Sequence, residues 1–410
     1  METSTSLELA KHTLLLVGTV LAAGTLSSLA ARLLRIPDVV VLLLVGILLG
    51  SQVTGIINVR ADSAINQLLL IFGSSYILFD GGAAVRLKVL KQVWVTVVTI
   101  STLGLLITAA ITGFAAYVIF AVPPIVALLL GAVIASTDPA TLVPVFKQIH
   151  IKPKVAQTVM SESAFNDAMG AILTFTVLGV AMGAGDFSVG DAMFGLVKQT
   201  LLGIAIGGAL GYAAAFFIAH EKLSFLAEYA PVVTLMAVIG AYMGADGLHA
   251  SGFMAVFVFG IILGNQDSLG FKVSKRDQTQ LEDFILTTSL IMRMFIFILL
   301  GSQVSFALMQ QYWLGGLGVV AVFMLVARPA TVFLCAWPDR RANWSFNELL
   351  FMCWTRETGV IPGALAGMLL GMKAPHAEMI ASVTFITILM TILIQATSTK
   401  WLAQKLNLLE

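Results

Sequence analysis

The sequence predicts an all-α polytopic membrane protein, and three observations carry this prediction. Of the 410 residues, 59% are hydrophobic and only 11% are charged, whereas charged residues make up about a quarter of a typical water-soluble domain. Apolar runs long enough to cross a bilayer recur along the whole chain. Lysine and arginine gather in every second connection between these runs, as in membrane proteins generally. The formal net charge of +1 gives no indication of a nucleic-acid partner.

Thirteen apolar segments can be marked, and all but one are long enough to span the hydrocarbon core. The exception is residues 249–264, a short and glycine-rich run. The segments are 9–31, 38–57, 62–84, 92–119, 123–146, 154–182, 192–219, 226–245, 249–264, 280–307, 312–336, 346–372 and 378–399. The connections are short, so we expect a single transmembrane domain over residues 1–410 without a soluble regulatory domain.

The basic residues predict the orientation of the chain. Counting connections alternately from an outer N-terminus places 16 of the 23 Lys and Arg residues inside and only four outside. Because positively charged loops stay on the cytoplasmic side, the N-terminus is predicted outside and the C-terminus inside. Three arginines, Arg293, Arg328 and Arg356, fall within predicted segments instead.

Two segments carry helix-breaking residues at their centres. In the first, Thr137-Asp138-Pro139 interrupts 123–146, and proline removes a backbone donor that a helix needs. A kinked and capped structural helix is one interpretation. The other is a broken helix that presents backbone groups to a transported ion.

The second interrupted segment is 346–372, where Arg356-Glu357-Thr358-Gly359 precedes Pro362. It is the seventh segment after the first one, so the two would run with opposite topology. This spacing indicates an inverted repeat, residues 9–182 and 226–399 joined by a linking helix at 192–219, with both breaks near the membrane midplane.

Charged side chains inside a membrane are candidates for function. The predicted segments hold more acids than the three arginines can neutralise, so protons, a bound cation or water must balance the excess. The acids are Asp80, Asp138, Glu162, Asp167 and Glu357.

Residues 154–182 concentrate this chemistry. Ser163 and Asp167 are four residues apart and share a helix face, which offers the hard oxygen ligands that suit an alkali cation. Burial favours the protonated form of Asp167, so proton and cation would exclude each other. On the adjacent face, Glu162 can pair with an arginine and Asn166 can orient Asp167. A set of interhelical hydrogen bonds that only fixes the bundle is the alternative.

The arginines have two interpretations each. Arg328, late in its segment, either extends its side chain to the inner surface or pairs within the bundle. Arg293 has apolar helical turns on both sides and is expected to be a buried ion-pair partner. Cys335 and Cys353 lie in apolar segments and are expected to be core residues. No metal-ligating cluster or nucleophile–base set is visible, so neither a cofactor nor an enzyme activity is expected.

Together these stretches resemble the NhaP-type sodium/proton antiporters of the cation/proton antiporter superfamily. The resemblance covers nearly the whole chain. The matching stretches are Arg35-Ile36-Pro37 with the leucine-rich helix to Gly50, Phe79-Asp80-Gly81-Gly82, Thr137-Asp138-Pro139, Glu162-Ser163-Ala164-Phe165-Asn166-Asp167, Gly252-Phe253 through Gly264-Asn265, Arg328-Pro329, and Gly359-Val360-Ile361-Pro362.

The resemblance implies a role for each site residue. Asp167 is the expected carboxylate for cation and proton, Ser163 and the main chain or hydroxyl of Thr137 are expected ligands, and Asp138 is expected to face the broken helices. Asp80 stands where the family usually has glutamate.

The resemblance also implies the charge balance of exchange. With Asn166 before Asp167, the sequence resembles the electroneutral branch of the family, which exchanges one cation for one proton. Glu162 is expected to pair with an arginine of 346–372. The family position of that arginine is Thr358 here, so the expected partner is Arg356, two residues earlier, beside the added Glu357. Arg293 is the alternative partner.

The function expected from the sequence is electroneutral exchange of Na⁺ or Li⁺ for H⁺ by alternating access, in a homodimer in the cell membrane. Exchange of K⁺ on the same fold is the nearest alternative. An ion-coupled symporter of an organic solute is a further one, although the compact cluster of carboxylate and hydroxyls offers little to bind a solute. A channel would differ by conducting without obligatory proton exchange.

Overall fold

A computed structural model describes residues 2–34, 36–137, 151–183, 189–219, 229–271 and 275–409. The described residues form helices joined by loops, with a lone antiparallel β-bridge between Ile151 and Leu409 among them. Nine helical spans in this part of the chain are long and apolar enough to cross a membrane. The protein is therefore an all-helical membrane protein, as predicted.

The described helices overlap the predicted apolar segments, although several of them begin or end a few residues outside the predicted bounds. Three of the segments, 92–119, 312–336 and 378–399, contain a π-helical turn between two α-helices. The α-helices are α1 (Glu2–Leu34), α2 (Asp38–Leu49), α3 (Ala64–Ala84), α4 (Leu87–Thr99), α5 (Leu105–Phe120), α6 (Pro124–Ala135), α8 (Pro153–Ala181), α9 (Val189–Ala219), α10 (Ala230–Gly247), α11 (Gly252–Gly264), α12 (Lys275–Ser302), α13 (Phe306–Val322), α14 (Arg328–Cys335), α15 (Phe346–Trp354), α16 (Val360–Gly371), α17 (Ala377–Thr391) and α18 (Thr397–Lys405).

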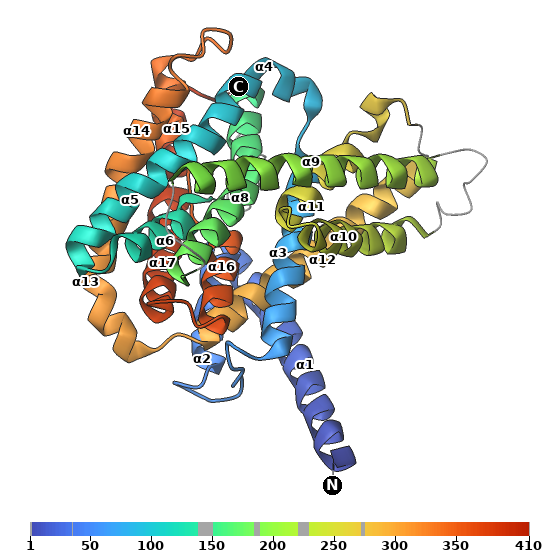
Figure 1. Ribbon diagram of the computed structural model, residues 1–410, viewed down its shortest axis with the longest axis vertical. Helices are drawn as coiled ribbons and strands as arrows, with labels where there is room; N and C mark the ends of the chain where they lie inside the picture. Colours follow the sequence, from blue (N-terminus) through green and yellow to red (C-terminus); the bar gives the residue numbers. More distant parts are fainter. Residues whose placement is uncertain are drawn as a thin grey trace.

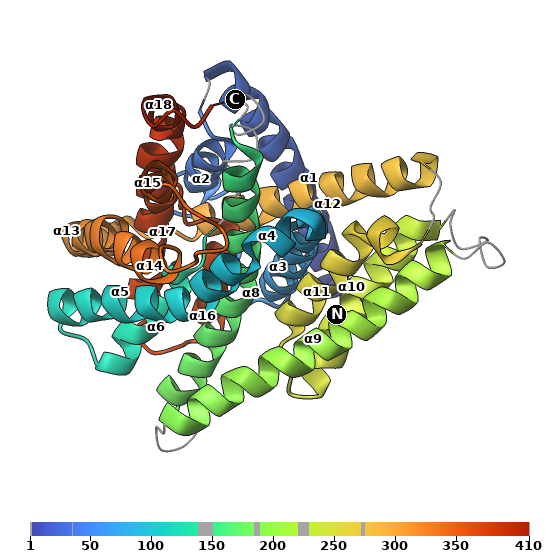
Figure 2. The same ribbon diagram turned by 90° about the horizontal axis from the view of Figure 1, so that it is seen from above.

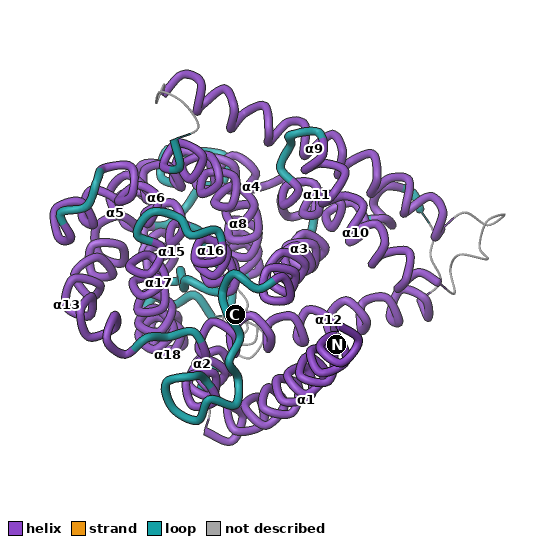
Figure 3. The backbone as a smooth tube through the Cα atoms, turned by 60° about the horizontal axis from the view of Figure 1, so that its bottom comes forward, coloured by secondary structure: helices purple, strands orange, loops and turns teal. Residues whose placement is uncertain are grey.

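The helices form two groups. Helices α1, α3 and α9 to α12 lie on one side of the molecule, and α5, α6, α13 to α15, α17 and α18 lie on the other (Figures 1 and 2). Helix α8 runs between the two groups, and α16 packs against both α3 and α17. The tube in Figure 3 shows the same division from a third direction. Helices α8 and α16 thus stand where the groups meet.

Helices α3 and α11 approach each other closely at two glycines. A Cβ atom on Gly82 would lie 2.2 Å from the Phe257 carbonyl oxygen, and one on Gly260 would lie 2.2 Å from the Phe79 carbonyl oxygen. Real Cβ atoms do not approach this closely, so only glycine fits at both positions. This contact holds α3 firmly in the first group.

Both predicted helix breaks have a counterpart in the structure. Helix α6 ends at Ala135, and Ser136 after it is extended, with φ −78° and ψ 154°. Helix α15 ends at Trp354 and α16 begins at Val360, so residues 355–359 form a non-helical segment in the middle of one crossing. The interruption of 346–372 is therefore confirmed. Asp138 and Pro139 lie outside the described residues.

Candidate functional site

The end of α6 meets α8 through hydrogen bonds. The Ser163 hydroxyl donates to the main-chain carbonyl of Thr137, and the Thr137 hydroxyl is 3.3 Å from Ser163 Oγ. Both residues are buried. Thr137 lies two residues beyond the end of α6, and its carbonyl accepts this hydroxyl from α8. The two groups predicted to ligate a cation therefore lie together.

Asp167 lies on the same face of α8 as these contacts. A Cβ atom on Gly170 would lie 2.7 Å from Ser136 Cβ, so this glycine also touches the end of α6. Positions 163, 167 and 170 repeat at helical spacing and share one face. Asp167 is thus bracketed by two contacts with residues 136–137, and its side chain is only 5% exposed.

Asp80 approaches the same region from the first helix group. It is half-buried near the end of α3. A Cβ atom on its neighbour Gly81 would lie 3.5 Å from Ala164 Cβ, in ordinary contact with α8 next to Ser163. The structure therefore brings Asp80 to the side of α8, in a position set by α3.

Glu162 makes a bidentate ion pair with Arg328. The guanidinium donates from Nη1 to Oε1 and from Nη2 to Oε2, each at 2.8 Å. Its Nε donates to the Met352 carbonyl at 2.9 Å. Arg328 is 1% exposed and Glu162 is 2% exposed. The interpretation that Arg328 extends to the inner surface is wrong, because its side chain turns into the bundle and binds Glu162.

The local sequence explains how Arg328 comes to face inward. Pro329 lacks an amide hydrogen, so a regular α-helix cannot continue undisturbed through it. A π-helical turn at Phe323–Ala327 precedes it, and α14 begins at Arg328. Such turns shift the register of a helix and are frequent at functional sites. Arg328 therefore directly follows a π-helical turn, a distortion that the adjacent Pro329 favours.

Arg356 joins the two helix breaks. From the 355–359 segment its Nη2 donates to the carbonyl of Ala135, the last residue of α6, at 2.5 Å. The negative end of the α6 dipole favours a cation at this point. Arg356 Nη1 also lies 3.5 Å from Glu162 Oε1. The predicted Glu162–Arg356 pair is confirmed, as the longer of the two ion pairs that Glu162 makes.

Arg293, the alternative partner, is half-buried on α12 and is not among the ion-pair partners of Glu162 in the described part of the chain. The alternative pairing is wrong because Arg328 and Arg356 already occupy the carboxylate.

The remaining residues of the second break are buried. Glu357 is 1% exposed, and the Thr358 amide donates to the Thr391 hydroxyl of α17 at 3.1 Å. Sequence reasoning did not find Thr391. The signal was present, because Thr384, Thr387 and Thr391 follow helical spacing within 378–399 and form a polar face on an otherwise apolar helix.

Asn166 differs from its expectation. It is fully buried on α8, yet among the described residues neither amide atom has a hydrogen-bond partner. The amide therefore does not orient Asp167 in this structure. The reason is geometric, since neighbouring residues of a helix point in different directions and do not face each other.

Among the described residues, the fully buried acidic and basic side chains near the two breaks are unequal in number. Carboxylates of Glu162, Asp167 and Glu357 stand against guanidiniums of Arg328 and Arg356, all at most 5% exposed. This set carries one excess negative charge when all five groups are ionised.

Interrupted helices that meet beside a buried carboxylate are typical of secondary ion transporters. Comparison with known proteins identifies the group within that class. Residues 17–405 match the family described as "Sodium/hydrogen exchanger, transmembrane". The chain belongs to this family.

Relatives with known names match along nearly the whole chain. Na(+)/H(+) antiporter 1 of Methanocaldococcus jannaschii is 33% identical, over 95% of each protein. The K(+)/H(+) antiporter NhaP of Alkalimonas amylolytica is 28% identical, over 97% of this chain and 67% of the relative. A solved structure of the sodium proton antiporter MjNhaP1 from M. jannaschii at pH 8 superposes with a TM-score of 0.80 at 30% identity, covering 99% of both chains.

Proposed function

We propose that this protein exchanges Na⁺ or Li⁺ for H⁺, one for one and without net charge movement, with both ions competing for Asp167. The observation that carries the proposal is the position of Asp167. It is buried on the face of α8 that touches the end of α6, one turn from the Ser163 hydroxyl and the Thr137 carbonyl.

The chemistry of these groups suits an alkali cation. A carboxylate, a hydroxyl and a main-chain carbonyl are hard oxygen ligands, the type that such cations take. Asp138 would add a second carboxylate from the segment after α6, and Asp80 a further one from α3. Asp80 is shorter than glutamate by one methylene, so its contact with a cation would run through water.

Competition at one carboxylate couples the two ions. With Asp167 neutralised by a proton or a cation, the excess negative charge of the buried set is gone and the loaded site can cross the barrier. With Asp167 empty, the uncompensated charge disfavours that movement. Asn166 adds no second titrating group, in keeping with one proton per cation.

Exchange of K⁺ is the second candidate. Several relatives along this chain are named K⁺/H⁺ antiporters, and the ligand types of the site suit either ion. Selectivity between Na⁺ and K⁺ depends on the size of the site.

The topology and assembly belong to the same proposal. We infer thirteen crossings with the N-terminus outside, from the distribution of Lys and Arg, and inverted repeats at residues 9–182 and 226–399 around a linking helix at 192–219. The second helix group would move against the first, which would form a homodimer in the cell membrane.

Reconstituted vesicles test the proposal. Purified protein is placed in liposomes that hold a pH-sensitive dye, and Na⁺, Li⁺ or K⁺ is added outside. We expect Na⁺ and Li⁺ to drive proton movement at a rate that an imposed membrane potential does not change. A rate that follows the potential would contradict electroneutral exchange. Proton movement with K⁺ and none with Na⁺ would select the second candidate.

A further inference from the structure

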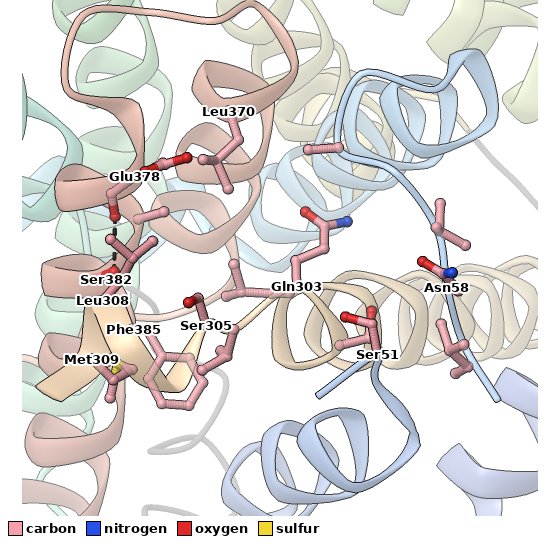
Figure 4. A pocket seen from close by; sticks show the side chains of 17 residues that line it. Ser51, Asn58, Gln303, Ser305, Leu308, Met309, Leu370, Glu378, Ser382 and Phe385 are labelled. Carbon is pink, nitrogen blue, oxygen red and sulfur yellow. Dashed lines mark hydrogen bonds between the residues drawn. The ribbon is translucent and has the colours of Figure 1, made fainter. Parts of the chain in front are cut away.

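A cavity of about 260 Å³ lies between the two helix groups (Figure 4). One side is lined by the loop that leads from α2 to α3 and by the end of α12, and α3 and α12 belong to the first group. The second group supplies the start of α13 and the first two turns of α17. A water molecule takes about 30 Å³ in the liquid, so the cavity has room for several. The charge pattern predicts that these loops lie outside the membrane.

Polar and acidic groups lie among the apolar side chains that line this cavity. Ser305, Ser382 and Gln303 contribute hydroxyl and amide groups, and Glu378 is the lone charged residue among those that line it. In Figure 4, Gln303 lies between Ser51 and Asn58 on one side and Ser305, Ser382 and Glu378 on the other. Carboxylate, hydroxyl and amide oxygens attract a hydrated monovalent cation rather than an anion.

One polar atom of the cavity lining has no hydrogen-bond partner among the described residues. The Gln303 amide donates from Nε2 to Asn66 Oδ1 at 2.9 Å, whereas its buried Oε1 accepts no hydrogen bond. A buried acceptor of this kind is costly unless water or a cation binds it. Gln303 is therefore a place where a passing ion or its hydration water can be held.

The nearby basic residues are paired away from the cavity. Arg60 Nη2 lies 2.8 Å from Asp62 Oδ2, and Lys373 Nζ lies 3.6 Å from the same atom. Neither basic side chain lines the cavity. The electrostatic potential inside the cavity therefore depends more on Glu378 than on Arg60 and Lys373.

The floor of the cavity lies against the second helix break. Leu300, which lines the cavity, has its Cδ2 3.0 Å from the place where a Cβ of Gly363 would be. Gly363 follows the 355–359 segment by one turn of α16. On α17, Ser382 and Phe385 line the cavity, and Thr391, two turns further on, binds the Thr358 amide. Leu300 therefore lies between the cavity and the first turn of α16, which follows the break.

We propose that this cavity is the outer vestibule through which the transported cation reaches the site. Glu378 attracts the cation, and the contact of Leu300 with Gly363 is the closed gate between vestibule and break. This inference rests on the proposed exchange of a cation for a proton. It adds the path and two residues outside the binding site.

Thiol labelling at Ser382→Cys tests the vestibule. The two native cysteines are buried, so the unmodified protein provides the labelling baseline. Cationic, anionic and neutral methanethiosulfonates of similar size are added to the outer face of right-side-out vesicles. We expect all three to label the new thiol from outside, whether or not the protein exchanges ions. The matched control is Gln310→Cys, on an exposed position of α13 that does not line the cavity.

Transport by the labelled protein separates electrostatics from obstruction. We expect the cationic adduct at Ser382→Cys to raise the KM for external Na⁺ by about threefold or more relative to the neutral adduct, and the anionic adduct to lower it, with the difference fading at high salt. The same adducts at Gln310→Cys should leave the KM unchanged. Equal effects of the three adducts at Ser382→Cys, or labelling only from the inner face, would overturn the proposal.

Glu378→Gln gives a second test without a reagent. It should raise the KM for external Na⁺ at low ionic strength and leave kcat unchanged, since Glu378 is outside the binding site. Asp246→Asn, an exposed acid at the end of α10, is the control and should change neither constant. An unchanged KM in Glu378→Gln would count against the vestibule. Absence of exchange in the unmodified protein would instead overturn the proposed function.

Discussion

Arg328 holds both carboxylate oxygens of Glu162 at 2.8 Å, and the pair is sealed from solvent. Its guanidinium also binds the Met352 carbonyl of α15. This one pair ties three helices, α8, α14 and α15, together beside the second break. Its removal from either side therefore has consequences for both stability and transport.

Breaking this pair should destabilise the protein strongly. Arg328→Gln leaves Glu162 with only the 3.5 Å contact to Arg356, and loss of one partner of a buried pair costs about 3–5 kcal/mol. Glu162→Gln removes the ion-pair partner of two buried guanidiniums and should cost as much. Thermal unfolding in detergent measures both. Melting temperatures unchanged from the unmodified protein would contradict a buried structural pair.

Arg356 should matter more for transport than for stability. Arg356→Gln loses the hydrogen bond to the Ala135 carbonyl, worth about 1.5–3 kcal/mol for a charged donor, while Arg328 keeps Glu162 paired. We expect a smaller loss of melting temperature than in Arg328→Gln, together with a marked fall in kcat, because the two helix breaks are no longer joined. A greater loss of stability than in Arg328→Gln would reverse the assigned roles.

Acidification should weaken cation binding at equilibrium. A proton and Na⁺ that compete for Asp167 exclude each other. Once the carboxylate is mostly protonated, each tenfold rise in proton concentration should therefore raise the apparent KM for Na⁺ about tenfold. Saturating Na⁺ should restore the rate at moderately acidic pH. The measurement is the initial exchange rate against Na⁺ concentration at several pH values. A pH effect on the maximal rate alone, at constant KM, would argue against competition.

The approach of α8 to the end of α6 can be tested with a matched pair of alanines on one helix. Gly170→Ala places a Cβ 2.7 Å from Ser136 Cβ and must push the two apart, whereas a Cβ on Gly179 meets nothing within 4 Å. Gly179→Ala should leave exchange intact and add up to about 1 kcal/mol of helix stability. Gly170→Ala should impair exchange, because the Ser163–Thr137 contact shifts. Equal behaviour of the two variants would show that this approach is unimportant.

The sequence was sufficient for the helices and for the centre of the site. Long apolar runs leave little choice of secondary structure in a bilayer, and proline with a charge at mid-segment marked both breaks. Asp167 and Ser163 followed from helical spacing. The Glu162–Arg356 contact was expected from the resemblance to the NhaP-type antiporters, which implies that Glu162 pairs with an arginine of 346–372.

What the sequence could not determine depends on three-dimensional packing. The inward turn of Arg328 arises from a π-helical turn, which no periodicity predicts. The bond from Arg356 to the Ala135 carbonyl involves a main-chain group that carries no sequence signal. The cavity beside Glu378 is formed by loops and helix ends far apart in the chain. Asp138 was placed at the site by pattern alone, and its role stays a prediction.

The measurement that tests the central claim most directly is exchange by Asp167→Asn in vesicles that hold a pH-sensitive dye. Asparagine has nearly the same shape but cannot take up a proton, so the fold should persist and Na⁺-driven proton movement should fall to the level of protein-free vesicles. Asp246→Asn, prepared in parallel, should exchange as the unmodified protein does. Na⁺-driven proton movement retained in Asp167→Asn would contradict the claim that cation and proton share this carboxylate.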